Sequence, residues 1–168
     1  MSHVQLKLPA SLLADDLRAA IDREAVKFPA AQKRSVVLAA LRMVQDKHQG
    51  WLSKELMDAV ADYLELPPIA VYEVATFYTL YDLKPVGRHK IYVCTNISCM
   101  LQGSGEIVRH FKQRLGVGFG ETTPDGKFTL KEAECLAACG GAPMCQIGTD
   151  YHENLTPESV DAILASLE

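Results

Sequence analysis

Cysteine is absent from the first 93 residues of this 168-residue chain, and all five cysteines fall between positions 94 and 145. No cluster of Lys and Arg is present either, and the net charge is −4. A face that binds nucleic-acid phosphates needs clustered positive charge, so we expect no nucleic-acid partner. The N-terminus lacks a basic start followed by an apolar run, which predicts that there is no signal peptide.

Long apolar runs are also missing. The stretch Ile69–Leu83 is interrupted by Glu73, Thr76 and Asp82 and is too short to span a bilayer. We therefore expect a cytosolic protein with no direct membrane insertion. Thiols stay reduced in the cytosol, so clustered cysteines predict metal or redox chemistry rather than disulfides.

Several catalytic patterns are absent as well. No C-x-x-C occurs, which argues against a thioredoxin-type dithiol. The glycines of Gly116–Gly120 do not form G-x-G-x-x-G, and Pro124 follows them, so we expect no dinucleotide site. No pairing of a nucleophile with a base can be recognised, and we predict no catalytic residue in this chain.

The uneven distribution of cysteine predicts two domains, residues 1–85 and residues 86–168. Residues 1–10 are expected to form a loose arm. Apolar residues at helical spacing then predict an N-terminal helical bundle. Its four helices are expected from a Ser11 cap to Lys27, over 31–48, after a Ser53 cap, and over 69–80. The last helix carries Tyr72, Phe77, Tyr78 and Tyr81, and spacing alone favours a core position for such aromatic residues.

Residues 82–87 are expected to link the two domains. The second domain alternates short β-branched segments with helical patterns, which predicts a small sheet with helices packed against it. Strands are expected over 89–93, 127–130 and 143–147, with a turn and a short strand or loop over 150–153. Helices are expected over 104–115 and from a Thr156 cap to Leu167. The fold class is therefore α+β, and this order of elements fits a thioredoxin-like arrangement.

Two cysteine pairs stand out in the second domain. Cys94 and Cys99 form C-x4-C, and Cys135 and Cys139 form C-x3-C after an interval of 35 residues. Two pairs of soft ligands on separate loops are typical of a metal centre. Cys145 lies in the apolar segment 144–147, and we interpret it as a buried core thiol.

Zinc sites, Rieske centres and [2Fe–2S] clusters differ in the cysteine spacing and the ligands that they need. Structural zinc sites most often use C-x2-C pairs, whereas gaps of four and three residues suit sulfurs that spread around the two irons of a [2Fe–2S] cluster. A Rieske centre needs two histidine ligands, and neither cysteine loop contains histidine. On spacing alone a [2Fe–2S] cluster is favoured, with zinc or inert core cysteines as alternatives.

The residues around the cysteines suggest how such a cluster is stabilised. Backbone N–H groups of residues 95–98 and of Gly140 and Gly141 are expected to donate to the sulfurs and offset their negative charge. Four apolar side chains are expected to exclude water from the centre: Met100, Leu101, Leu136 and Met144.

With these residues in view, the chain resembles the E-subunit family of NADH-quinone oxidoreductase, the small [2Fe–2S] subunit of the NADH-oxidising arm of respiratory complex I. Four stretches carry the resemblance: residues 66–81, the first cysteine loop at 93–99, residues 118–130, and Glu134-Cys-Leu-Ala-Ala-Cys-Gly-Gly-Ala-Pro143.

The resemblance implies an N-terminal helical bundle followed by a thioredoxin-like [2Fe–2S] ferredoxin domain. Cys94, Cys99, Cys135 and Cys139 take the family's ligand positions. The implied function is electron transfer within NADH:quinone oxidoreductase, with FMN and NADH bound by a larger flavoprotein subunit rather than by this chain. A large iron–sulfur subunit is a further expected partner, and residues 67–81 become part of the packing surface. The chain is then expected on the cytoplasmic side, in the peripheral arm of an inner-membrane-associated complex.

The sequence departs from the family at one position that matters to the site. Family members commonly have Gly where this chain has Ala137, which bears on the backbone conformation there. Two alternative functions are kept: the equivalent subunit of an NAD-linked formate dehydrogenase or hydrogenase, and a zinc-stabilised adaptor.

Overall fold

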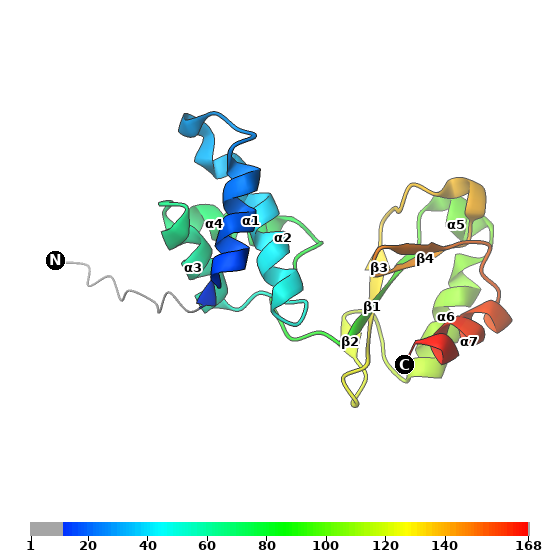
Figure 1. Ribbon diagram of the computed structural model, residues 1–168. Coiled ribbons are helices and arrows are strands. Elements are labelled where there is room, and N and C mark those ends of the chain that lie inside the picture. The colour runs from blue at the N-terminus through cyan, green and yellow to red at the C-terminus, as the bar shows by residue number, and fades with distance from the viewer. Residues whose placement is uncertain (1–11, 168) are drawn as a thin grey trace. The chain divides into compact units, whose positions relative to one another are not determined.

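In a computed structural model of the chain, residues 12–167 are described. The chain divides into two compact units, Met1–Pro85 and Val86–Glu168 (Figure 1). The arm expected over residues 1–10 and the Ser11 cap lie outside the described residues. Each unit has its own hydrophobic core, and the two cores share none of the described residues.

The first unit is helical. Its elements are α1 (Asp15–Ala25), η2 (Ala30–Val36), α2 (Val37–Lys47), α3 (Lys54–Tyr63) and α4 (Pro68–Phe77). Leu17 and Ile21 of α1 pack with Leu41 of α2 and Val60 of α3 in one buried cluster, because these residues recur at helical spacing. The predicted cap of the third helix is confirmed, since the Ser53 hydroxyl accepts from the Leu56 amide at 3.3 Å.

Two predicted helices differ in detail. The segment expected as one helix over 31–48 is a 3-10 helix followed by α2, and the 3-10 helix is itself kinked at Gln32, which has φ −112° and ψ 36°. The helix expected over 69–80 ends at Phe77, where Tyr78 is already extended. Of the four aromatic residues here, Tyr81 is buried and its hydroxyl donates to the Leu38 carbonyl at 2.7 Å. The expectation of a core position is wrong for Phe77, the last residue of α4, which is 77% exposed.

The link between the units is shorter than expected. The Asp82 amide donates to the Gln45 side chain of the first unit at 2.8 Å, and the Gly87 amide donates to Thr129 Oγ1 of the second at 2.6 Å. Gly87 lies so close to the backbone of Phe128 that a Cβ there would come within 2.7 Å of its carbonyl carbon. The linker is therefore residues 83–86, and Gly87 is a packed residue of the second unit.

The second unit is a five-stranded mixed sheet with helices. Its strands are β1 (His89–Cys94), β2 (Glu121–Thr122), β3 (Phe128–Ala133), β4 (Cys145–Ile147) and β5 (Asp150–His152). They are ordered β2-β3-β1-β4-β5; β1 and β3 run parallel, and every other pair is antiparallel. The remaining elements are α5 (Ile97–Leu101), α6 (Ser104–Leu115), η3 (Cys139–Gly141) and α7 (Pro157–Ser166). Neither α5 nor β2 is expected from the sequence pattern.

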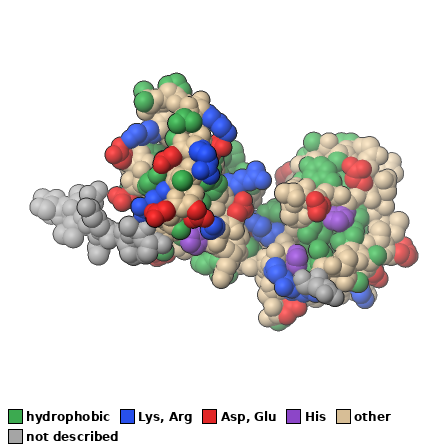
Figure 2. Space-filling model, in the orientation of Figure 1, with side chains coloured by type: hydrophobic (Ala, Val, Ile, Leu, Met, Phe, Trp, Pro, Cys, Tyr) green, Lys and Arg blue, Asp and Glu red, His purple; other side chains and the backbone are tan. Residues whose placement is uncertain are grey.

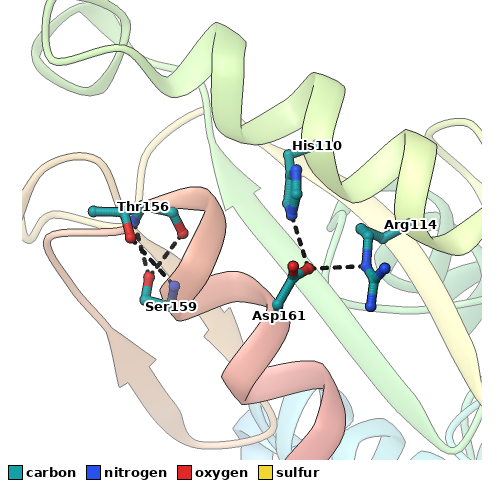
Figure 3. A network of polar contacts seen from close by, with 5 residues as sticks. All are labelled: His110, Arg114, Thr156, Ser159 and Asp161. Carbon is teal, nitrogen blue, oxygen red and sulfur yellow. Dashed lines mark hydrogen bonds and ion pairs between the residues drawn. The ribbon is translucent and has the colours of Figure 1, made fainter.

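Helices α6 and α7 lie side by side against one face of the sheet (Figure 1). Asp161 of α7 accepts hydrogen bonds from His110 and Arg114 of α6, both at 2.8 Å (Figure 3). The predicted Thr156 cap is confirmed: Thr156 and Ser159 form a reciprocal capping box at the start of α7.

Charged side chains of both signs are intermingled on the visible face of the first unit (Figure 2). Across residues 12–167, none of the helices combines the length and the apolar character that crossing a bilayer requires.

Candidate metal centre

The first cysteine of each pair lies at the same edge of the sheet. Cys94 is the last residue of β1, and its register partner on the parallel strand β3 is Ala133, two residues before Cys135. The Thr95 amide extends the pairing by donating to the Ala133 carbonyl at 3.1 Å. Because the carboxyl ends of parallel strands meet at one edge, the fold brings together loops that are far apart in sequence.

The short helix α5 turns Cys99 inward. Asn96 caps this helix by accepting from the Ile97 amide at 2.8 Å, and one turn places Cys99 beside Cys94, with both thiols buried. Met144 is fully buried against them. The second cysteine loop packs on this cluster through Leu136, Ala138 and Ala142.

Water exclusion by Met100 and Leu101 is a wrong prediction. Leu101 is 76% exposed and Met100 is 58% exposed, because successive residues of a helix point in different directions and α5 uses its inner side for Cys99. Of the residues expected to cover the centre, Met144 is fully buried and Leu136 is half-buried. The sequence predicted an irregular loop where α5 forms. Because the helix was not predicted, the outward direction of Met100 and Leu101 could not be predicted either.

The second pair is on the surface. Cys135 and Cys139 are both exposed, and Cys139 begins the 3-10 turn η3. Between them, Ala137 has φ +58°, in the left-handed region that L-residues rarely adopt. Its amide donates to Cys135 Sγ at 3.4 Å. This donor was not among the expected ones.

The second of the two glycines after Cys139 acts differently from what we expected. The Gly141 amide donates to the Ala138 carbonyl at 3.1 Å, within the turn, rather than to a sulfur. The missing side chain of Gly141 instead makes room for Glu153, whose Cδ would lie 2.4 Å from a Cβ at this position. Likewise, the Thr95 and Ile97 amides are used by the strand pairing and the Asn96 cap described above.

Burial dominates the ionisation of the inner thiols. Desolvation and then the hydrogen-bonded Cys94 thiol raise the pKa of Cys99 to about 11, and charge on nearby Cys139 acts in the same direction. Burial alone raises the pKa of Cys145 to about 12. Cys145 is fully buried in β4, so the prediction that it is a core thiol is confirmed.

These positions fit a dinuclear centre chemically. Two thiols come from the end of β1 and from helix α5, two come from the segment that follows β3, and each iron of a [2Fe–2S] cluster takes two protein ligands. Over residues 12–167 the structure contains no group of three or more Cys, His, Asp or Glu side chains placed to hold a single metal ion.

The fold and this donor set define a class of protein, the thioredoxin-like [2Fe–2S] ferredoxins. A family model of that description matches residues 21–168. The NADH-quinone oxidoreductase E subunit of Rickettsia bellii is 48% identical to the chain, covering 84% of both sequences. The E 2 subunit of the same enzyme from Rhizobium meliloti is 44% identical, covering 89% of this chain and 88% of the relative. The chain therefore belongs to the E-subunit family of NADH-quinone oxidoreductase, and the resemblance drawn from its motifs is confirmed.

A mitochondrial protein and a solved hydrogenase structure are also similar to the chain, the second in fold only. The mitochondrial NADH dehydrogenase [ubiquinone] flavoprotein 2 of Dictyostelium discoideum is 41% identical over 88% of this chain and 60% of its own length. Among solved structures, an NAD+-reducing [NiFe]-hydrogenase in the air-oxidised state superposes with a TM-score of 0.68. It is 19% identical over 78% of this chain, and the matched part spans 22% of the hydrogenase chain, so this likeness concerns the fold alone.

Proposed function

We propose that this chain is the small electron-transfer subunit of an NADH:quinone oxidoreductase and that Cys94, Cys99, Cys135 and Cys139 hold its [2Fe–2S] cluster. The observation that carries the proposal is the meeting of two cysteine loops at the carboxyl ends of the parallel strands β1 and β3. Membership of a [2Fe–2S] ferredoxin family supports the identity of the metal centre.

The bound cluster supplies a centre that accepts and releases one electron at a time. The protein contributes the four thiols, and the protons of Cys94 and Cys99 are displaced when metal binds. Met144 keeps water from the inner side, and the Ala137 amide donates to Cys135. Cys94 and Cys99 are buried, whereas Cys135 and Cys139 are exposed. We therefore propose that electrons enter and leave on the side of Cys135 and Cys139.

A flavoprotein subunit that binds NADH and FMN is the partner we propose, with a large iron–sulfur subunit as a second one. Exposed apolar residues in each unit support such contacts. On α5, beside Cys99, these are Ile97, Met100 and Leu101; at the end of α4 and after it, these are Phe77, Tyr78, Leu80 and Leu83. Patches of this kind mark interaction surfaces in many proteins. We place the chain in the peripheral arm of the complex, on the cytoplasmic side.

The division at Pro85 and Val86 is part of the proposal: an N-terminal helical bundle as a docking domain and a thioredoxin-like domain as the electron carrier. The equivalent subunit of an NAD-linked hydrogenase or formate dehydrogenase is the second candidate. Only the fold favours it, whereas sequence identity of 44–48% favours the quinone oxidoreductase.

Anaerobic purification with metal and sulfide analysis tests the proposal. We expect a brown protein that contains iron and acid-labile sulfide and gives an EPR signal on reduction by dithionite. Cys139→Ser is expected to lose or strongly perturb that signal, whereas Cys145→Ser, a matched change at the buried thiol, is expected to retain it. A colourless protein with a single zinc, or bleaching by Cys145→Ser, would contradict the cluster or the ligand set respectively.

A further inference from the structure

One peptide unit of the second cysteine loop is hydrogen-bonded at both ends. The Ala137 N–H donates to Cys135 Sγ at 3.4 Å, and the Leu136 carbonyl accepts from the Tyr151 hydroxyl at 2.9 Å. These two groups belong to the same planar trans peptide, so they point in opposite directions. Fixing the carbonyl therefore fixes the direction in which the N–H points.

This peptide needs an anchor from outside the loop. Ala137 follows it with φ +58°, a conformation that costs an L-residue free energy, so the local chain does not favour the observed orientation. Tyr151 lies on β5, where its register partner is Gln146 of β4, so the sheet sets the position of its backbone, and its half-exposed side chain reaches the Leu136 carbonyl.

The residues after Tyr151 hold the same loop farther along. The Asn154 amide donates to the Gly141 carbonyl at 2.7 Å, and the Leu155 amide donates to the Pro143 carbonyl at 2.9 Å. The loop is thus tied at its far end by backbone and at Leu136 by a side chain. Of these ties, the one at Leu136 involves a group that a single conservative substitution removes.

We propose that Tyr151 is a positioning residue that aims the Ala137 N–H at the Cys135 sulfur and thereby tunes the reduction potential of the cluster. The inference rests on the proposed function, in which Cys135 is a ligand. The hydrogen bond from the Tyr151 hydroxyl to the Leu136 carbonyl polarises this peptide, and the polarised Ala137 N–H forms a stronger hydrogen bond to Cys135 Sγ. One-electron reduction adds negative charge to the cluster and its sulfurs, so an N–H donor stabilises the reduced state more than the oxidised state. The hydroxyl of Tyr151 accordingly raises the reduction potential.

Tyr151→Phe tests this role because it keeps the ring and removes the hydroxyl. In an EPR-monitored titration with dithionite, we expect the variant to have a more negative midpoint potential and altered g-values. Loss of iron to a chelator is expected to become faster, because residues that orient metal ligands contribute roughly tenfold or more to metal affinity. Tyr63→Phe is the matched control, because it removes a hydroxyl that donates to Asp22 at 2.8 Å in the first unit. It is expected to leave the potential and g-values unchanged.

Amide exchange in the cluster-free chain gives a readout that does not depend on the metal. We expect Tyr151→Phe to speed exchange of the Ala137 amide while the Asn154 amide keeps its wild-type rate, which shows that the loop stays folded. A loaded variant with the wild-type potential overturns the inference, whatever the exchange rates. If wild-type protein forms no cluster at all, the proposed function is overturned and this inference falls with it; the two failures are therefore distinguishable.

Discussion

Ala137 is an L-residue with a left-handed backbone conformation. Its φ of +58° is ordinary for Gly and costs an L-residue roughly 1–2 kcal/mol. We expect Ala137→Gly to raise the free energy of unfolding by about 1 kcal/mol, because glycine adopts this conformation without steric conflict. Urea unfolding of the cluster-free chain, followed by circular dichroism, measures the change.

Ala165→Gly is the matched control for that substitution. Ala165 is exposed near the end of α7, where Gly is expected to lower the free energy of unfolding by roughly 0.5–1 kcal/mol. The same chemical change should therefore have opposite signs at the two sites. Destabilisation by both substitutions would mean that the left-handed conformation at Ala137 carries no strain.

At the residue scale, the sequence predicted what depends on spacing and missed what depends on tertiary contacts. The two cysteine pairs and the burial of Cys145 follow from linear patterns. The Ala137 donor does not, because its direction is set by Tyr151, which lies 14 residues farther along. Gly141 was expected to let its amide approach a sulfur. Its missing side chain instead makes room for the Glu153 side chain, a contact that no pattern in the sequence indicates.

At the scale of elements, one carboxylate bridges α6 and α7 in addition to the apolar contacts between the two helices. Asp161 accepts from both His110 and Arg114, and all three side chains are partly exposed, so solvent screens the interaction. We expect Asp161→Asn to lower the free energy of unfolding by about 0.5–1 kcal/mol at low salt and by less at high salt. Urea unfolding at the two ionic strengths measures this difference.

Asp150→Asn removes the same charge from an exposed position of the same unit, where the carboxylate accepts from its neighbour Thr149. It is expected to be nearly neutral. An equal effect of the two substitutions would assign the loss to net charge rather than to the bridge between the helices.

Elements with strong periodicity were predicted well, and the short ones were not. The helix over 104–115 matches α6, and β1 was placed to within a residue. Helix α5 was missed because five residues are too few to show a hydrophobic period, and the Asn96 cap is its main signal. Strand β2, Glu121–Thr122, exists because it pairs with β3, which a local pattern cannot reveal.

At the scale of the whole molecule, the absence of cysteine from the first 93 residues was the most informative single feature. It separates a helical unit with its own core from a unit that carries the metal centre. The composition could not show how short the connection is, because Asp82 and Gly87 are fixed by hydrogen bonds to residues distant in sequence, Gln45 and Thr129.

Two separate cores joined by residues 83–86 should unfold as two transitions. Trp51, the single tryptophan, lies in the first unit and reports on it by fluorescence, while amide exchange of β1 and β3 reports on the second. Gln45→Ala removes side-chain bonds to the Leu80 carbonyl and the Asp82 amide. It is expected to lower the stability of the first unit by about 1–3 kcal/mol, since it removes two hydrogen bonds, one of them buried.

The decisive comparison sets this variant against Asp161→Asn. Gln45→Ala should move the fluorescence midpoint in urea and leave exchange in the sheet unchanged, and Asp161→Asn should do the reverse. The physical reason is that, within residues 12–167, neither core contributes a residue to the other, so the free energy lost in one unit is not shared. If each variant shifted both readouts equally, the chain would unfold as one cooperative unit, and contacts outside the two cores would have to account for that coupling.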